Sequence, residues 1–156
     1  MQFVMQSKTE LLRWALAVVV IVAVVGEFGY GQERKTLTLT HARQLPFSDG
    51  VLVENTLYVA GQEGTDDSDK LAAGGIGPET TAALGNIAKV LKAAGFELKD
   101  VVSVTVYLAD IHDFPEMNKV YKSVMPDPKP ARATIQAAAL VNDARVEISA
   151  IAVKQK

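Results

Sequence analysis

Two charged side chains, far apart in the chain, have the right types for chemistry on a small acidic molecule. Arg132 follows the proline-rich stretch 126–130 and opens an expected strand, where its guanidinium could bind a carboxylate or phosphate through two hydrogen bonds. Glu147 lies between Val146 and Ile148 midway along another expected strand, where it could pair with an arginine or orient a water molecule as a weak base. The residues alone favour plainer interpretations, namely a surface arginine at a strand edge and a cross-strand ion pair of little energetic weight.

Other residues have suitable types but lack the spacing that metal or nucleotide sites need. His41 and His112 are the only histidines, and no acidic ligand lies at helical spacing from His41, which disfavours a metal site. The acidic segment 66–69 lacks the glycine and the terminal glutamate of a calcium loop, and the glycine-rich segment 74–77 lacks the lysine of a phosphate-binding loop. The absence of cysteine excludes disulfides, thiolate catalysis and thiolate metal sites.

Length and charge narrow the function classes further. A chain of 156 residues suits one domain that can bury a sizeable core without cross-links. The net charge of −2 and the isoelectric point of about 5.7 argue against a protein that binds nucleic acid electrostatically. Aromatic residues make up only 6%, so surfaces that stack on single-stranded nucleic acid are scarce.

The N-terminus is distinct from the rest of the chain. The run 14–25 is entirely apolar, is preceded by Lys8 and Arg13, and is followed by Gly26, a pattern typical of a secretory signal peptide. The run is shorter than the roughly 20 residues of a membrane span, so an uncleaved anchor is the alternative. We therefore expect a signal peptide or membrane anchor at 1–26, a linker at 27–35 and a folded domain at 36–156. The domain is then periplasmic or secreted, and it meets a membrane only if the N-terminal segment is retained.

The folded domain shows alternating strand and helix patterns that predict an α+β protein. Within 101–108 the pattern assigns Val102, Val104, Val106 and Leu108 to one face. Helices on one side of a largely antiparallel sheet would leave the other side uncovered, with Val101, Tyr107, Ile151 and Val153 on it, and such an apolar face favours oligomerisation. Strands are expected at 36–40, 51–53, 57–60, 101–108, 131–138 and 145–153, and helices at 78–94 and from Asp113 onward.

Six stretches of the chain resemble, in the same order, six elements of one known family. They are LYVAGQ at 57–62, GGIGPETTAALGN at 74–86, VVSVTVYLAD at 101–110, DFPEMNKVY at 113–121, PARAT at 130–134 and RVEISA at 145–150. From about residue 45 to residue 153 the chain resembles the RidA (YjgF) family of imine deaminases. The resemblance implies a chorismate-mutase-like fold with a six-stranded, mostly antiparallel sheet, two helices packed on one face, and a homotrimer with ligand pockets between subunits.

The resemblance also implies an activity and roles for particular residues. The expected reaction is hydrolysis of reactive 2-imino or enamine acids, such as 2-aminoacrylate, to 2-keto acids and ammonia, without a cofactor. Arg132 would hold the substrate carboxylate, and Glu147 would orient the attacking water. Backbone groups of Gly61 and Thr134 would line the pocket, with Asn118 nearby.

The chain departs from the family pattern at several positions around the expected pocket. Phe47 stands where a tyrosine is frequent, Ala60 replaces a serine, and Glu63 replaces an apolar residue. Ser149 replaces a second glutamate, and Val141 stands where the family often has proline. These departures keep an alternative open, which is a non-catalytic binder of 2-keto acid-like molecules on the same trimer. A ribonuclease role ranks third, because the chain is acidic and lacks a catalytic histidine pair.

Overall fold

The computed structural model describes residues 33–39 and 46–154. The predicted signal peptide or anchor at 1–26 and His41 lie outside these ranges, so the expected export stays a prediction. None of the described helices has the length and apolar character needed to cross a membrane. The sheet begins at Arg34, two residues earlier than expected, so the end of the predicted linker belongs to a strand.

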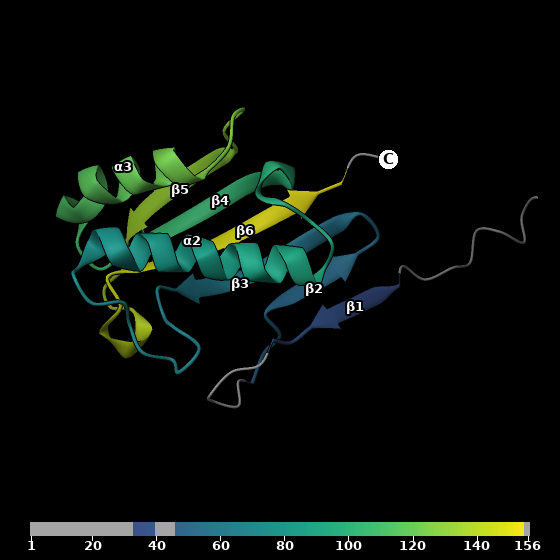
Figure 1. The fold of residues 1–156 in the computed structure, drawn as a ribbon, viewed down its shortest axis with the longest axis horizontal. Coiled ribbons are helices and arrows are strands. Elements are labelled where there is room, and N and C mark those ends of the chain that lie inside the picture. The colour runs from purple at the N-terminus through teal and green to yellow at the C-terminus, as the bar shows by residue number, and fades with distance from the viewer. Residues whose placement is uncertain (1–32, 40–45, 155–156) are drawn as a thin grey trace, which may run out of the picture. The chain divides into compact units, whose positions relative to one another are not determined.

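One mixed sheet and two helices make up the described fold (Figure 1). The strands follow the order β1-β2-β3-β6-β4-β5, and every neighbouring pair is antiparallel except β4 and β5. The predicted six-stranded α+β fold is thereby confirmed. The strands are β1 (Arg34–Leu37), β2 (Gly50–Val53), β3 (Thr56–Glu63), β4 (Val101–Leu108), β5 (Ala131–Gln136) and β6 (Val146–Val153), and the helices are α2 (Ile76–Ala93) and α3 (Phe114–Val124).

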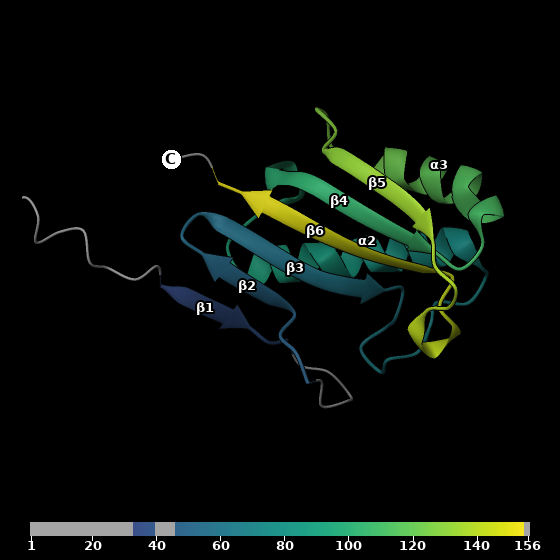
Figure 2. The same ribbon diagram turned by 180° about the vertical axis from the view of Figure 1, so that it is seen from behind.

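Both helices cover the same face of the sheet, and the view from behind shows the strands of the opposite face uncovered (Figure 2). Helix α2 buries the apolar stripe that its sequence predicts, including Leu84, Ile87 and Leu91. It ends as expected at Gly95, whose positive φ of 78° allows Phe96 to donate a backbone hydrogen bond of 2.8 Å to the Leu91 carbonyl.

A β-bulge at the start of β4 overturns part of the predicted alternation. Val101 pairs with Ala152, but Ser103 pairs with Ile151, so β4 carries one extra residue. Val101 is therefore buried under the helices, and Val102 is 47% exposed. The assignments of Val102 to the core and of Val101 to the uncovered face were wrong, because strict alternation takes no account of a bulge.

The bulge predicts that substitutions at two valines of β4 change the free energy of unfolding by different amounts. Replacing the buried Val104 by threonine places a hydroxyl in an apolar core, which we expect to lower the free energy of unfolding by about 1–3 kcal/mol. Val102→Thr, a matched substitution at an exposed site, should change it by less than about 0.5 kcal/mol. Urea denaturation of both variants measures the difference, and equal losses would contradict the register described above.

Candidate active site

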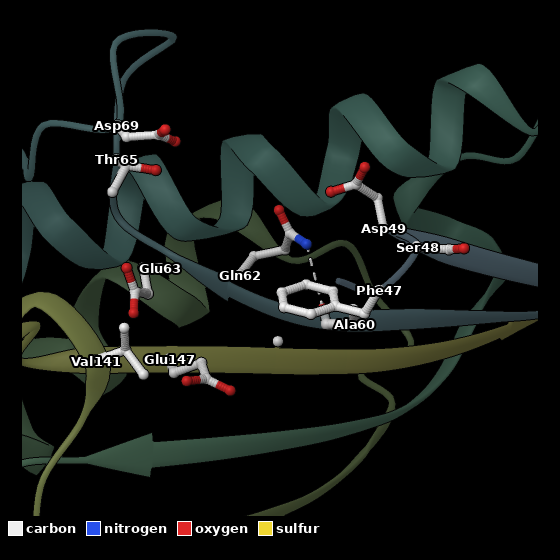
Figure 3. A pocket seen from close by; sticks show the side chains of 11 residues that line it. Phe47, Ser48, Asp49, Ala60, Gln62, Glu63, Thr65, Asp69, Val141 and Glu147 are labelled. Atoms are coloured by element: carbon white, nitrogen blue, oxygen red, sulfur yellow. Dashed lines mark hydrogen bonds between the residues drawn. The ribbon is translucent and has the colours of Figure 1, made fainter. Parts of the chain in front are cut away.

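A cavity of about 490 Å³ opens at the C-terminal end of β3, beside the start of β6 (Figure 3). Phe47 and Val141 form exposed apolar walls, with 53% and 63% of their surfaces accessible. Glu63 and Glu147 supply carboxylates to the same cavity. Other described residues that line it are Ser48, Asp49, Ala60, Gly61, Gln62, Thr65 and Asp69.

Glu147 is held against the backbone of the neighbouring strand. It lies on β6 with Tyr107 of β4 as its register partner on one side and Glu63 of β3 on the other. A Cβ atom added to Gly61 would overlap with the Glu147 carboxylate, so only glycine leaves room for this placement. Gly61 therefore lies in the same cavity as Glu147, and its role in substrate binding stays a prediction.

A second bulge, in β3, sets the direction of Glu63. Val59 pairs with Ala150, whereas Gln62 pairs with Ile148, so the segment between Val59 and Gln62 contains one extra residue. Gln62 consequently turns toward the core at 8% exposure, and Glu63 shares the uncovered face with its partner Glu147. Without the bulge, the period-2 pattern would direct Glu63 into the core.

The environment of Glu147 disfavours its charged form. Burial raises the pKa of its carboxyl group above the ordinary glutamate value, and the negative charge of Glu63 raises it further. The Glu63 carboxylate accepts a hydrogen bond of 2.7 Å from the side-chain amide of Asn142. The cavity therefore holds two carboxyl groups in one electrostatic environment, and the raised pKa makes the Glu147 carboxylate a better proton acceptor than an ordinary glutamate.

Arg132 occupies a different environment on the edge strand β5. Its guanidinium lies over the Tyr121 ring, 4.4 Å from the centroid, and 5.6 Å from that of Phe114. It donates a hydrogen bond of 2.7 Å to the Asn118 side-chain oxygen. Phe114, Asn118 and Tyr121 follow one stripe of α3, so their spacing could have indicated this cluster from the sequence.

A second cavity, of about 500 Å³, opens beside Arg132. Asn118 and Tyr121 line it together with Arg132. The hydroxyls of Tyr121 and Thr134 are buried, and neither has a hydrogen-bond partner within the described part of the chain. Arg132 thus stands beside a cavity and two unsatisfied hydroxyls, which suits the binding of an anion that brings its own acceptor atoms.

The two charged residues face opposite sides of the sheet. Arg132 is the register partner of Val104, which is buried under the helices, whereas Glu147 is the partner of Tyr107 on the uncovered face. The six predicted site residues therefore fall into two groups within one protomer. Glu147 lies with Phe47 and Gly61, and Arg132 lies with Asn118 and Thr134.

Arg145 fixes the start of β6. Its backbone N–H donates a hydrogen bond of 2.8 Å to the buried Glu79 carboxylate of α2. Its guanidinium binds both oxygens of Asp113, at 2.7–3.0 Å. The strand expected at 145–153 therefore begins at Val146, one residue after Arg145. The Asp113 side chain binds Arg145 and makes no capping hydrogen bond to α3.

Comparison with known proteins identifies the family of the chain. Residues 39–154 match the family model described as endoribonuclease L-PSP. The chain is 50% identical over 110 residues to the 2-iminobutanoate/2-iminopropanoate deaminase of Bos taurus, covering 70% of this chain and 80% of the relative. The corresponding Mus musculus deaminase is 44% identical over 124 residues, covering 78% and 92% of the two chains.

Among solved structures, RidA from a Psychrobacter species superimposes with a TM-score of 0.72 at 35% identity, covering 77% of this chain and 99% of the other. Escherichia coli TdcF with bound serine gives 0.72 at 27% identity, covering 78% and 100%. The chain belongs to the endoribonuclease L-PSP family, which is the RidA (YjgF) family that its motifs resemble.

The Glu63–Glu147 pair predicts a shift that can be measured directly. Glu63→Gln removes one of the two causes that raise the Glu147 pKa, so this pKa should fall, while the effect of burial keeps it above the ordinary value. A pH titration of side-chain carboxyl signals by NMR, with Glu147→Gln to assign the resonance, measures the change. An unchanged Glu147 titration in Glu63→Gln would show that the two carboxyl groups do not interact.

Proposed function

We propose that this protein hydrolyses 2-imino and enamine acids to 2-keto acids and ammonia, in sites formed between copies of the chain. The observation that carries the proposal is the pair of half-sites, an arginine beside an anion-sized cavity and a glutamate of raised pKa beside another. Relatives named 2-iminobutanoate/2-iminopropanoate deaminase support the reaction class.

The proposed reaction needs little more than correct placement of substrate and water. Arg132 binds the substrate carboxylate through its planar fork of donors. The Glu147 carboxylate accepts a proton from water as the oxygen bonds to C2 of the protonated imine, giving a 2-amino-2-hydroxy acid. Glu147 then passes this proton to the amino nitrogen. As the C–N bond breaks, the Glu147 carboxylate takes the proton of the C2 hydroxyl, and ammonia and a 2-keto acid are released; the ammonia finally takes up the proton from Glu147 as ammonium. An imine carbon is already electrophilic, so orientation supplies most of the acceleration.

The site requires more than one protomer. Because Arg132 and Glu147 lie on opposite faces of one sheet, each can meet only the counterpart from another copy. The uncovered face also carries large apolar side chains, including Tyr58 and Ile135, each 50% exposed. A homotrimer, as the family resemblance implies, would cover this face and bring the half-sites together.

Mixing two inactive variants tests the shared site. Arg132→Ala and Glu147→Gln should each lose at least about a hundredfold in kcat/KM, because each lacks one half-site. When the two are unfolded together and reassembled in equal amounts, about a quarter of the sites should combine an intact arginine with an intact glutamate from different chains. About a quarter of wild-type activity should therefore return.

The assay measures keto acid formed from an imine that an amino-acid oxidase generates, with semicarbazide competing for the imine. Separately reassembled variants serve as controls and should stay inactive. If the mixture regains no activity, Arg132 and Glu147 do not act together in a site shared between two chains, and the proposed shared site is rejected. Binding of 2-keto acids by calorimetry without any turnover by the wild type would favour the non-catalytic binder instead.

Gly61 provides a further test, because its missing Cβ makes room for the Glu147 carboxylate. Gly61→Ala should displace that carboxylate and lower kcat by about tenfold or more, with the fold retained. Gly85→Ala is the matched control, because a Cβ at Gly85 in α2 meets nothing within 4 Å. Circular dichroism checks folding in both variants. Full activity of Gly61→Ala would argue against a role for Glu147 in this position.

The family description also names an endoribonuclease, but the cavity around Glu147 gives that activity little support. Its described lining includes carboxylates and no lysine, arginine or histidine. RNA phosphates would be repelled there, because binding to nucleic acid depends on cationic contacts.

A further inference from the structure

The Glu147 cavity contains a carboxylate that the proposed hydrolysis does not use. Glu63 is placed on the cavity wall by the β3 bulge and faces the same side as Glu147 (Figure 3). Directly opposed residues on neighbouring strands have Cβ atoms about 5 Å apart, so the two side chains share one small volume. Asn142, in the turn Val141–Asp143, donates to Glu63 at 2.7 Å and so fixes the direction of the carboxylate.

The charge of Glu63 restricts how a 2-imino acid can lie in the site. The substrate carboxylate is repelled by Glu63 and attracted by the Arg132 of another copy, so it points away from the β3 side. With C2 at Glu147, the remaining substituent of C2 is the substrate side chain. That side chain then extends along the wall that holds Glu63.

The cavity also offers an aromatic surface. The Phe47 ring is 53% exposed and lies toward the Ala60 end of the cavity, whereas Glu63 lies toward the Val141 end (Figure 3). A cationic side chain gains from the Glu63 carboxylate, and a guanidinium group that reaches an aromatic ring also stacks on it. A cavity of about 490 Å³ is within the range that binds small molecules of this size.

We propose that Glu63 is a specificity-determining residue that selects 2-imino acids with a positively charged side chain. This inference rests on the proposed hydrolysis, since it assigns the substrate class of the same site. A neutral substrate side chain gains nothing from the Glu63 carboxylate, and an anionic side chain is repelled by it.

Two imines of nearly equal shape provide the test, one derived from arginine and one from citrulline, which carries a neutral urea in place of the guanidinium. The wild type should hydrolyse the arginine-derived imine with a kcat/KM about tenfold higher, mainly through a lower KM, as expected for one partly solvated charge pair. The preference should shrink as salt is raised from 0.01 to 0.5 M, because ions screen the attraction.

Glu63→Gln should reduce the preference to within about twofold while hydrolysis of the citrulline-derived imine continues. The matched control is Glu54→Gln, which removes the same charge from the exposed turn before β3, at the opposite end of that strand from Glu63. This control should keep the wild-type preference.

The outcomes separate this inference from the proposed function. Hydrolysis of both imines with no preference in the wild type, or with a preference that persists in Glu63→Gln, overturns the role of Glu63 and leaves the deaminase standing. A wild-type preference that is insensitive to salt also contradicts it. Failure to hydrolyse any 2-imino acid, including those from alanine and leucine, overturns the proposed function and this inference with it.

Discussion

The alternation of side chains along a β-strand is the constraint on which the candidate site depends. Successive residues point to opposite faces, and register partners on neighbouring strands share a face. Val104 therefore fixes the side of Arg132, and Tyr107 fixes the side of Glu147. Because the sheet separates these two sides, Arg132 and Glu147 do not meet within one protomer, and the proposed chemistry, which uses both groups, would require assembly.

Two β-bulges, one in β4 and one in β3, interrupt this alternation. In β4 the extra residue exposes Val102 without disturbing the core positions that follow. In β3 the extra residue lies beside Gly61, turns Gln62 inward and brings Glu63 next to Glu147. Bulges of this kind commonly redirect side chains near functional sites. The bulge in β3 directs the Glu63 side chain to the cavity instead of the core. The cavity therefore contains a second carboxylate beside that of Glu147.

Much of the fold was predictable from the sequence, because it depends on local patterns. The apolar stripe of α2, its end at Gly95 and the alternation in β6 are all set by neighbouring residues, and each is found as expected. Side-chain partners are set by the tertiary fold and were predicted less well. Asp113 has the sequence context of a helix cap, yet a guanidinium 32 positions away binds it more favourably. The sheet register that divides the site residues between two faces likewise depends on long-range pairing.

The contacts around Arg145 connect the two half-sites within each protomer. Asp113 precedes α3, which carries the Asn118 and Tyr121 partners of Arg132, and Arg145 precedes β6, which carries Glu147. Their bidentate ion pair, with Glu79 holding the Arg145 backbone, ties α3 and α2 to the start of β6. In the proposed ring of identical chains, the relation between the two half-sites of one protomer would set how they meet the half-sites of its neighbours. The Arg145–Asp113 ion pair would then hold the geometry of each proposed site without touching the substrate.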